Sequence, residues 1–313
     1  MLKYSYMIPL IIISSVVLFL VLLFFLALYF LYRFTFYSPH KGQSDDFAQL
    51  DSPNFKPFKD TIIPLIKELK SKPYEDLCCQ SYDKLRLHAR YFEVKGSKKI
   101  ALMFHGYRGT AYRDFCGGAK EVMALGYSAI IVDQRAHGQS QGHSITFGVR
   151  EVKDAVTWFN YIKEKFGEDY EYILVGISMG GATVLAAADK LPKNVKIIAD
   201  CPFSSPKAIL FETLIKMNLS PKFFYPFVNL SSIIYGHTNM NKMSALDSLK
   251  NAENKILIIH GNKDTVVPYP ISQKLYETYP DKIQYELFDG ADHGASYLVD
   301  QERYRKAVKD FLQ

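Results

Sequence analysis

Residues 172–190 read YILVGISMGGATVLAAADK, and this stretch decides how the rest of the chain is interpreted. Its first four residues form a short apolar run typical of a buried strand, and the residues from 179 on predict a helix. Between them lies the pattern G-x-S-x-G, with Ser178 at its centre. The pattern predicts a sharp turn from strand to helix that lifts the serine hydroxyl above a sheet. Gly176 and Gly180 remove side chains that such a strained turn would bring into collision.

Apolar runs like the one before this turn recur along the chain. Each is about five residues long and continuous rather than alternating, which is typical of parallel strands buried on both faces. They lie at 100–104, 128–132, 172–175, 195–199, 256–259 and 283–287. Two further runs, 76–82 and 85–94, predict an antiparallel hairpin. Helical stretches alternate with the runs, so the sequence predicts an α/β fold with an eight-stranded, mostly parallel sheet and helices on both faces.

Reactive side chains follow several of these runs. Ligands of such sheets bind beyond the carboxyl ends of the strands. A serine hydroxyl is a weak nucleophile until a base takes its proton, and the base is in turn oriented by an acid. His293, after the last run, is the candidate base, and Asp264, after the run before it, is the candidate acid. The sequence therefore predicts a catalytic triad of Ser178, Asp264 and His293.

Other residues at the strand ends compete for these roles or for different ones. Asp200, Asp289 and Asp292 are alternative acids, and Asp200 is the strongest of them because it ends a strand. Structural roles are expected for the remaining polar residues: Asp133 as a cap of loop amides, His137 as a loop histidine bonded to backbone, and His105 and His260 as turn residues beside the site. No spacing typical of a zinc site supports a metal.

Five spaced motifs resemble those of α/β-hydrolases, in the group of serine aminopeptidases and monoacylglycerol-lipase-like enzymes that includes bacterial membrane-anchored members. The matching text is His105-Gly106, Asp133…His137-Gly138…Ser140, Gly176–Gly181, His260-Gly261-Asn262-Lys263-Asp264…Val267-Pro268 and Asp292-His293-Gly294. The resemblance covers residues 75–313 and implies an oxyanion hole made by the backbone N–H groups of Tyr107 and Met179. It implies no metal and no organic cofactor. Ala136 departs from the family's usual glycine, which puts only the shape of its loop in question.

The amino-terminal segment predicts a membrane span. Residues 8–32 read IPLIIISSVVLFLVLLFFLALYFLY and contain no charge. About 20 apolar residues cross the hydrocarbon core as a helix, whereas a signal peptide has an apolar region of about 7–15. We therefore expect an anchor at 1–37, then a tether and lead-in helix at 38–74. Lys3 and the amino terminus balance Arg33 and Lys41, so charge does not fix the orientation. By analogy with single-span enzymes of this layout, an extracytoplasmic catalytic domain in the cell membrane is slightly favoured.

Composition narrows the function further. A net charge of +6 is scattered over 313 residues, which argues against a nucleic-acid partner. Hydrophobic residues make up 48% of the chain, so global disorder is excluded. The spacing of the four cysteines suits neither a zinc ribbon nor a redox pair, and three or four buried free thiols are expected, at Cys78, Cys79, Cys116 and Cys201.

The β/α rhythm stops between residues 203 and 249, where aromatic and aliphatic residues gather. We expect a small helical cap there with an apolar underside, which would favour acyl or other lipophilic groups. The predicted function is a membrane-anchored serine hydrolase of carboxylic esters, lipid esters among them. A peptidase or amidase of the serine aminopeptidase type, and a non-catalytic binding protein with the same fold, remain as alternatives.

Overall fold

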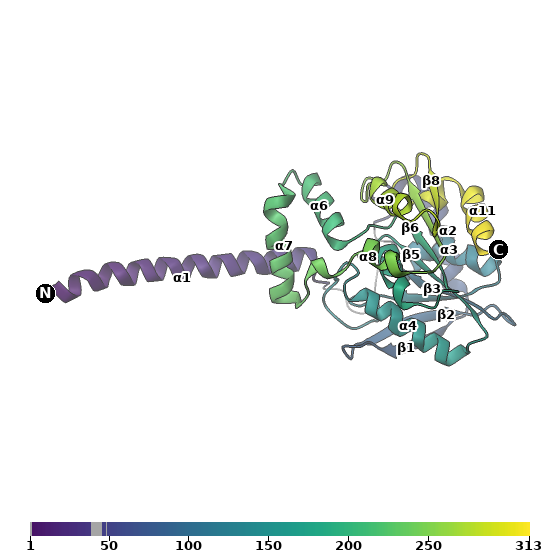
Figure 1. Cartoon of the computed structure of the whole chain (residues 1–313), viewed down its shortest axis with the longest axis horizontal. Coiled ribbons are helices and arrows are strands. Elements are labelled where there is room, and N and C mark those ends of the chain that lie inside the picture. Colours follow the sequence, from purple (N-terminus) through teal and green to yellow (C-terminus); the bar gives the residue numbers. More distant parts are fainter. Residues whose placement is uncertain (1, 39–45, 48) are drawn as a thin grey trace.

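An eight-stranded sheet with the order β1-β2-β4-β3-β5-β6-β7-β8 lies at the centre of the computed structural model (Figure 1). The structure describes residues 2–38, 46–47 and 49–313. The strands are β1 (Glu75–Gln80), β2 (Arg86–Phe92), β3 (Lys99–Phe104), β4 (Ser128–Asp133), β5 (Glu171–Ile177), β6 (Lys196–Asp200), β7 (Ile256–Gly261) and β8 (Ile283–Phe288). β2 pairs antiparallel with β1 and β4, and every other pairing is parallel. The predicted sheet is therefore confirmed.

Alternate residues of each central strand enter two separate hydrophobic cores. In β3, Ile100, Leu102 and Phe104 belong to one core, while Ala101 and Met103 belong to the other. Both faces are buried, which explains the continuous apolar runs in the sequence. Residues of the first core come from the helices α4 (Glu151–Phe166), α5 (Met179–Ala187), α8 (Ala245–Asn251) and α9 (Pro270–Thr278); residues of the second come from α2 (Lys59–Ser71), α3 (Ala111–Ala124), α10 (Ser296–Val299) and α11 (Gln301–Leu312).

Two helices are inserted between β6 and the helix α8 that leads to β7. They are α6 (Pro206–Lys216) and α7 (Pro221–Gly236), and the short 3-10 helix η3 (Met240–Lys242) follows them. Each begins with a proline, which suits the first helical turn because the proline N–H would have no partner there. Ser205 caps α6 by accepting a hydrogen bond from the N–H of Ala208. The sequence predicts helices in this insertion, and the structure has them.

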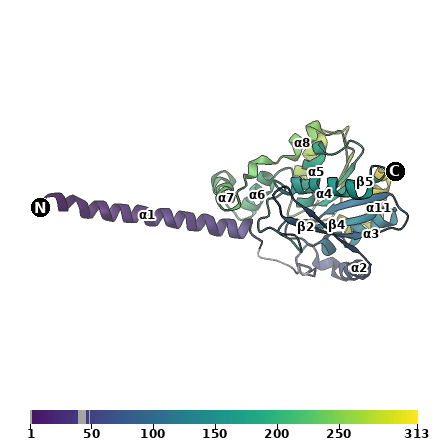
Figure 2. The same ribbon diagram turned by 90° about the horizontal axis from the view of Figure 1, so that it is seen from below.

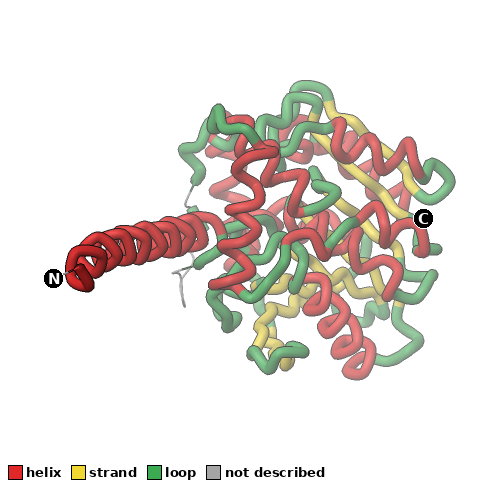
Figure 3. The backbone as a smooth tube through the Cα atoms, turned by 60° about the vertical axis from the view of Figure 1, so that its left-hand side comes forward, coloured by secondary structure: helices red, strands yellow, loops and turns green. Residues whose placement is uncertain are grey.

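The helix α1 (Leu2–Thr35) projects from the body as a long rod (Figure 2). Within the described part of the chain, its segment Met7–Thr35 is the one helix long and apolar enough to cross a membrane. Its carboxyl-terminal end differs from the rest because Leu28, Tyr32 and the following Phe36 are buried against the body. Figure 3 shows this end of the rod beside other helices. In this packed end, the Tyr32 hydroxyl contacts the Ser144 hydroxyl at 2.5 Å.

The predicted burial of the cysteines is wrong for half of them. Cys116 and Cys201 are buried, whereas Cys79 is half-buried and Cys78 is exposed. Both of the latter lie on β1, which is the edge strand of the sheet. An edge strand has no neighbour on one side and is poorly covered, so adjacent apolar thiols there are left accessible to solvent.

Candidate active site

Ser178 occupies a strained turn between β5 and α5. Its backbone angles are φ 55° and ψ −112°, which residues other than glycine rarely adopt. A Cβ added to Gly180 would lie 1.8 Å from the Phe104 carbonyl oxygen, and one added to Gly176 would lie 2.2 Å from the Gly180 carbonyl oxygen. Any larger residue at either position would collide with backbone. The two glycines therefore permit the close approach of strands and helix that the turn requires.

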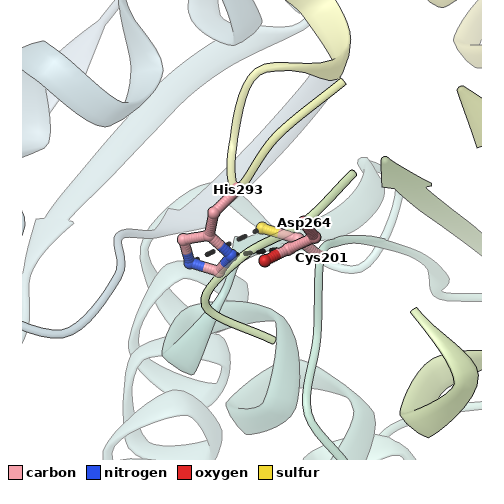
Figure 4. Close-up of side chains that lie close together, drawn as sticks. All are labelled: Cys201, Asp264 and His293. Atoms are coloured by element: carbon pink, nitrogen blue, oxygen red, sulfur yellow. Dashed lines mark hydrogen bonds and ion pairs between the residues drawn. The ribbon is translucent and has the colours of Figure 1, made fainter. Parts of the chain in front are cut away.

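The structure brings together the three residues that the sequence predicts as a triad. His293 Nε2 lies 2.9 Å from Ser178 Oγ, and His293 Nδ1 lies 2.8 Å from Asp264 Oδ2. The serine follows β5, the aspartate follows β7 and the histidine follows β8, at one edge of the sheet. Figure 4 shows the imidazole of His293 beside Asp264 and Cys201. The arrangement can pass the serine proton to an imidazole that a carboxylate holds in place.

Backbone amides hold the Asp264 carboxylate in position. Its Oδ1 accepts hydrogen bonds from the N–H groups of Val266 at 2.8 Å and Val267 at 2.7 Å. Burial would raise the pKa of Asp264, but the nearby His293 and the hydrogen bonds from His260 and His293 outweigh burial and hold the pKa well below its usual range. Burial would likewise lower the pKa of His293, but the Asp264 carboxylate raises it above its usual value of 6.5. The pair is therefore arranged to stabilise a positive imidazole.

None of the alternative acids reaches the His293 ring. Asp200 is buried, its Oδ1 has no hydrogen-bond partner in the described part of the chain, and burial raises its pKa to about 6. Asp292 accepts the N–H of Thr265 and the backbone N–H of His293, both at 2.7 Å. Asp289 bonds the side chain of Asn262. Asp264 is thus the carboxylate that contacts the imidazole.

Three consecutive backbone amides lie in the loop after β3. In the described part of the chain, the first and third have a protein acceptor, and the middle one, that of Tyr107, has none. Gly106 N–H donates to Asp114 Oδ2 at 2.8 Å, and Arg108 N–H donates to His137 Nε2 at 3.0 Å. Within residues 2–38, 46–47 and 49–313, no acceptor contacts the N–H of Tyr107 or of Met179. The oxyanion hole that the resemblance implies at these two amides stays a prediction. His137 and Asp133, which accepts the Gln139 N–H at 3.0 Å, hold loops as predicted.

Two contributions to the site were missed in the sequence. His260 was expected to be a turn residue, but its Nε2 lies 3.1 Å from Asp264 Oδ2 and its Nδ1 lies 2.7 Å from Ser272 Oγ. The four-residue spacing of His260 and Asp264 is the sequence feature that could have predicted this contact. Asn54, in the segment predicted as a tether, donates to the His293 carbonyl at 3.3 Å. Residues 39–45 and 48 of that segment lie outside the described residues.

Cys201 is the nearest thiol to the imidazole. Its Sγ lies 4.0 Å from His293 Nε2. The atoms with which Cys201, Asp264 and His293 could bind a metal ion all lie within 4.8 Å of one another. A metal ion would need a thiolate and a free imidazole nitrogen there. Burial raises the thiol pKa well above its ordinary value, and both ring nitrogens already have partners. The cluster therefore suits proton transfer better than metal binding.

Two cavities meet at Ser178. One, of about 420 Å³, extends into the body on the α3 side and is lined by Asn54, Phe55, Arg113, Asp200 and Tyr304, among others. The other, of about 370 Å³, runs under α6 and α7 and is almost wholly apolar in its lining. A carbonyl bound at Ser178 can therefore extend one substituent into each cavity.

The fold resembles that of known structures. The Pyrococcus furiosus esterase Pf2001 matches over 79% of this chain and 92% of its own, with a TM-score of 0.64 and 24% identity. The chain has the α/β-hydrolase fold. The family model described as serine aminopeptidase, S33, matches residues 95–230, which include the turn at Ser178 and the inserted helix α6.

Curated proteins of similar sequence match part of the chain. The uncharacterized protein YqkD of Bacillus subtilis is 27% identical over 191 residues, which are 60% of this chain and 63% of YqkD. The lysophosphatidylserine lipase ABHD12 of Danio rerio is 25% identical over 203 residues, which are 60% of this chain and 50% of the lipase. The matched region thus spans less than two thirds of either relative.

Proposed function

We propose that this α/β-hydrolase is a membrane-anchored serine hydrolase that cleaves carboxylic esters through an acyl-enzyme on Ser178. The observation that carries the proposal is the continuous hydrogen-bonded path from Ser178 Oγ through His293 to Asp264, with steps of 2.9 and 2.8 Å. A path of this kind activates a serine for attack on a carbonyl carbon.

The reaction begins when His293 Nε2 takes the proton of Ser178 and the serine oxygen bonds to the ester carbonyl carbon. The N–H groups of Tyr107 and Met179 donate to the resulting oxyanion, and each such donor lowers the barrier by about 3 kcal/mol. The imidazolium then gives its proton to the alkoxide oxygen as the ester C–O bond breaks. Water, deprotonated by the same imidazole, attacks the acyl-enzyme carbonyl carbon. The bond from that carbon to Ser178 Oγ then breaks, the imidazolium returns its proton to Oγ, and the acid leaves. No step uses a cofactor.

The apolar cavity beside Ser178 favours an ester with a hydrocarbon chain, and a relative named as a lysophosphatidylserine lipase is consistent with a lipid ester. The match to the serine aminopeptidase model favours a second candidate, a peptidase or amidase, because the same triad cleaves both bond types. A non-catalytic binding protein is the third reading.

A fluorophosphonate probe tests the catalytic serine in the full-length protein held in detergent micelles. We expect wild type to label and Ser178→Ala not to label. Ser128→Ala is the matched control, because this buried serine bonds the Val94 N–H far from the site. Wild type that fails to label, and that hydrolyses no p-nitrophenyl ester or aminoacyl amide, would leave the binding protein as the better reading. A panel of both substrate types separates esterase from amidase.

The anchor is proposed for residues 1–37, the tether and lead-in helix for 38–74, and the catalytic domain for 75–313 with a cap at about 203–249. The exposed apolar surface of α1 between Met7 and its body-proximal end supports the anchor. Protease protection on intact cells tests the proposed extracytoplasmic side: the catalytic domain should be digested without lysis. Protection until lysis would place it in the cytoplasm.

A further inference from the structure

The apolar cavity beside Ser178 has walls from several separate parts of the chain. Leu31, Phe34 and Thr35 line it from the end of α1, and Ser178 lies at its inner end. The remaining lining is mainly from the cap and its neighbours, including Phe203, Ile209, Thr213, Leu214, Phe224 and Val228. The helix proposed as a membrane anchor therefore forms one wall of the cavity that reaches the nucleophile.

This wall is held in a defined place. Tyr235 of α7 donates its phenol proton to the Phe25 carbonyl at 2.9 Å, and its ring lies 5.4 Å from that of Tyr29. Arg108 donates to the carbonyl of Phe34 at 2.8 Å. Figure 1 shows α7 crossing the body-proximal end of α1. The end of α1 thus belongs to the structure of the cap and is not a loose tether.

The outer surface around this cavity is also apolar. Phe34 is 69% exposed and Phe223, on α7, is 61% exposed. Phe223 contacts Phe227 with ring centroids 5.6 Å apart, and Phe227 contacts Phe24 of α1 at 6.3 Å. Exposed apolar surface continues onto the cap at Ile215, Met217 and Ile233. A patch of this kind marks an interaction site, and its continuity with the bilayer-crossing face of α1 identifies lipid as its partner.

We propose that the hydrocarbon chain of an ester lipid passes from the bilayer between α1 and the cap into this cavity, and that Leu31 on α1 and Thr213 on α6, which both line it, set the chain length accepted. The proposal rests on the ester hydrolase function above. The chain would lie in the 370 Å³ cavity, and the other part of the ester would face the 420 Å³ cavity on the α3 side. In this arrangement α1 selects the substrate as well as anchoring the enzyme.

The test uses p-nitrophenyl esters of two to sixteen carbons with the full-length protein in detergent micelles. Leu31→Trp and Thr213→Trp each add bulk to one wall. Leu22→Trp is the control for the first, because Leu22 is exposed on the same helix far from the cavity. Thr157→Trp is the control for the second, because Thr157 and Thr213 both bond the carbonyl four residues earlier at 2.9 Å, but Thr157 lies on α4 outside the cavity.

We expect both cavity variants to lose about tenfold or more in kcat/KM for the long esters while the two-carbon ester changes little, because a narrowed apolar pocket discriminates by chain length. Both controls should keep the wild-type profile. Unchanged chain-length profiles in both cavity variants would overturn the proposal, as would an equal fall for short and long esters in a variant whose Ser178 still labels with the probe. Wild type inactive on every ester would instead overturn the proposed function.

Discussion

The phenol of Tyr107 donates a hydrogen bond of 2.8 Å to the carbonyl oxygen of Thr35, the last residue of α1. The last carbonyl groups of a helix have no partner within the helix, so this bond satisfies one of them. The same residue carries, on its backbone, one of the two N–H groups proposed for the oxyanion hole. The side chain of Tyr107 therefore joins the end of α1 to the loop proposed for the oxyanion hole, beside the bond from Arg108 to the Phe34 carbonyl.

Replacing this phenol tests the link. We expect Tyr107→Phe to lower kcat about fivefold, because a typical hydrogen bond contributes about 1 kcal/mol and its loss loosens the loop that presents the N–H group. Tyr172→Phe is the matched control, since Tyr172 also donates to a backbone carbonyl, that of Gly167 at 2.6 Å, but lies far from the site. Steady-state ester hydrolysis and melting temperatures should be measured together. If both variants lose stability equally and neither loses kcat, the bond is only structural.

The pH profile should have its acid limb above pH 6.5. His293 accepts the serine proton only when it is neutral, and the Asp264 carboxylate raises its pKa above 6.5 despite burial. Activity is therefore lost as the pH falls through this raised value. Asp264 itself stays ionised there because its pKa is held low. The check is kcat/KM for a short ester between pH 5 and 9. A half-maximal point below 6.5 would contradict the electrostatic account.

Substitution of Asp264 and of Asp200 shows which of these two carboxylates orients the His293 imidazole. Asp264→Asn should lower kcat by about 10⁴-fold, because the imidazole is then no longer held in the correct tautomer and its positive form has no opposite charge beside it. Its remaining activity should show an acid limb at lower pH, since burial then acts on His293 without the opposing carboxylate. Asp200→Asn should cost less than about tenfold, because the carboxylate that bonds His293 Nδ1 is that of Asp264 and not that of Asp200. The reverse order of losses would assign the acid to Asp200.

The strand runs and the elbow could be predicted because they follow local rules. A continuous apolar run marks a strand buried on both faces, and G-x-S-x-G encodes a turn whose glycines meet backbone. Ala136 has φ 63° in the structure, a left-handed conformation that suits the glycine that the resemblance leads one to expect there. The chain order of Ser178, Asp264 and His293 then predicts that the three residues meet at one edge of the sheet, where the structure places them.

The contacts that escaped prediction are those between segments distant in sequence. Neither the packing of α1 on the cap nor the bond from Asn54 to His293 has a local signature, because each depends on how two separate elements meet. The exposure of Cys78 was missed for a related reason: composition does not show which strand lies at the edge of the sheet. Such features follow from the tertiary arrangement and not from the local sequence.

The elbow glycine gives a final prediction on stability. Gly180→Ala should destabilise the protein by about 3 kcal/mol or more, because the new Cβ would lie 1.8 Å from the Phe104 carbonyl oxygen and backbone on β3 would have to move. Gly118→Ala is the control, since its Cβ would lie 3.5 Å from Phe115 in ordinary contact, and a helical alanine should add about 0.5–1 kcal/mol. Thermal unfolding of the full-length variants in the same detergent measures both. A Gly180→Ala protein as stable as wild type would mean that β3 and α5 can separate at the elbow.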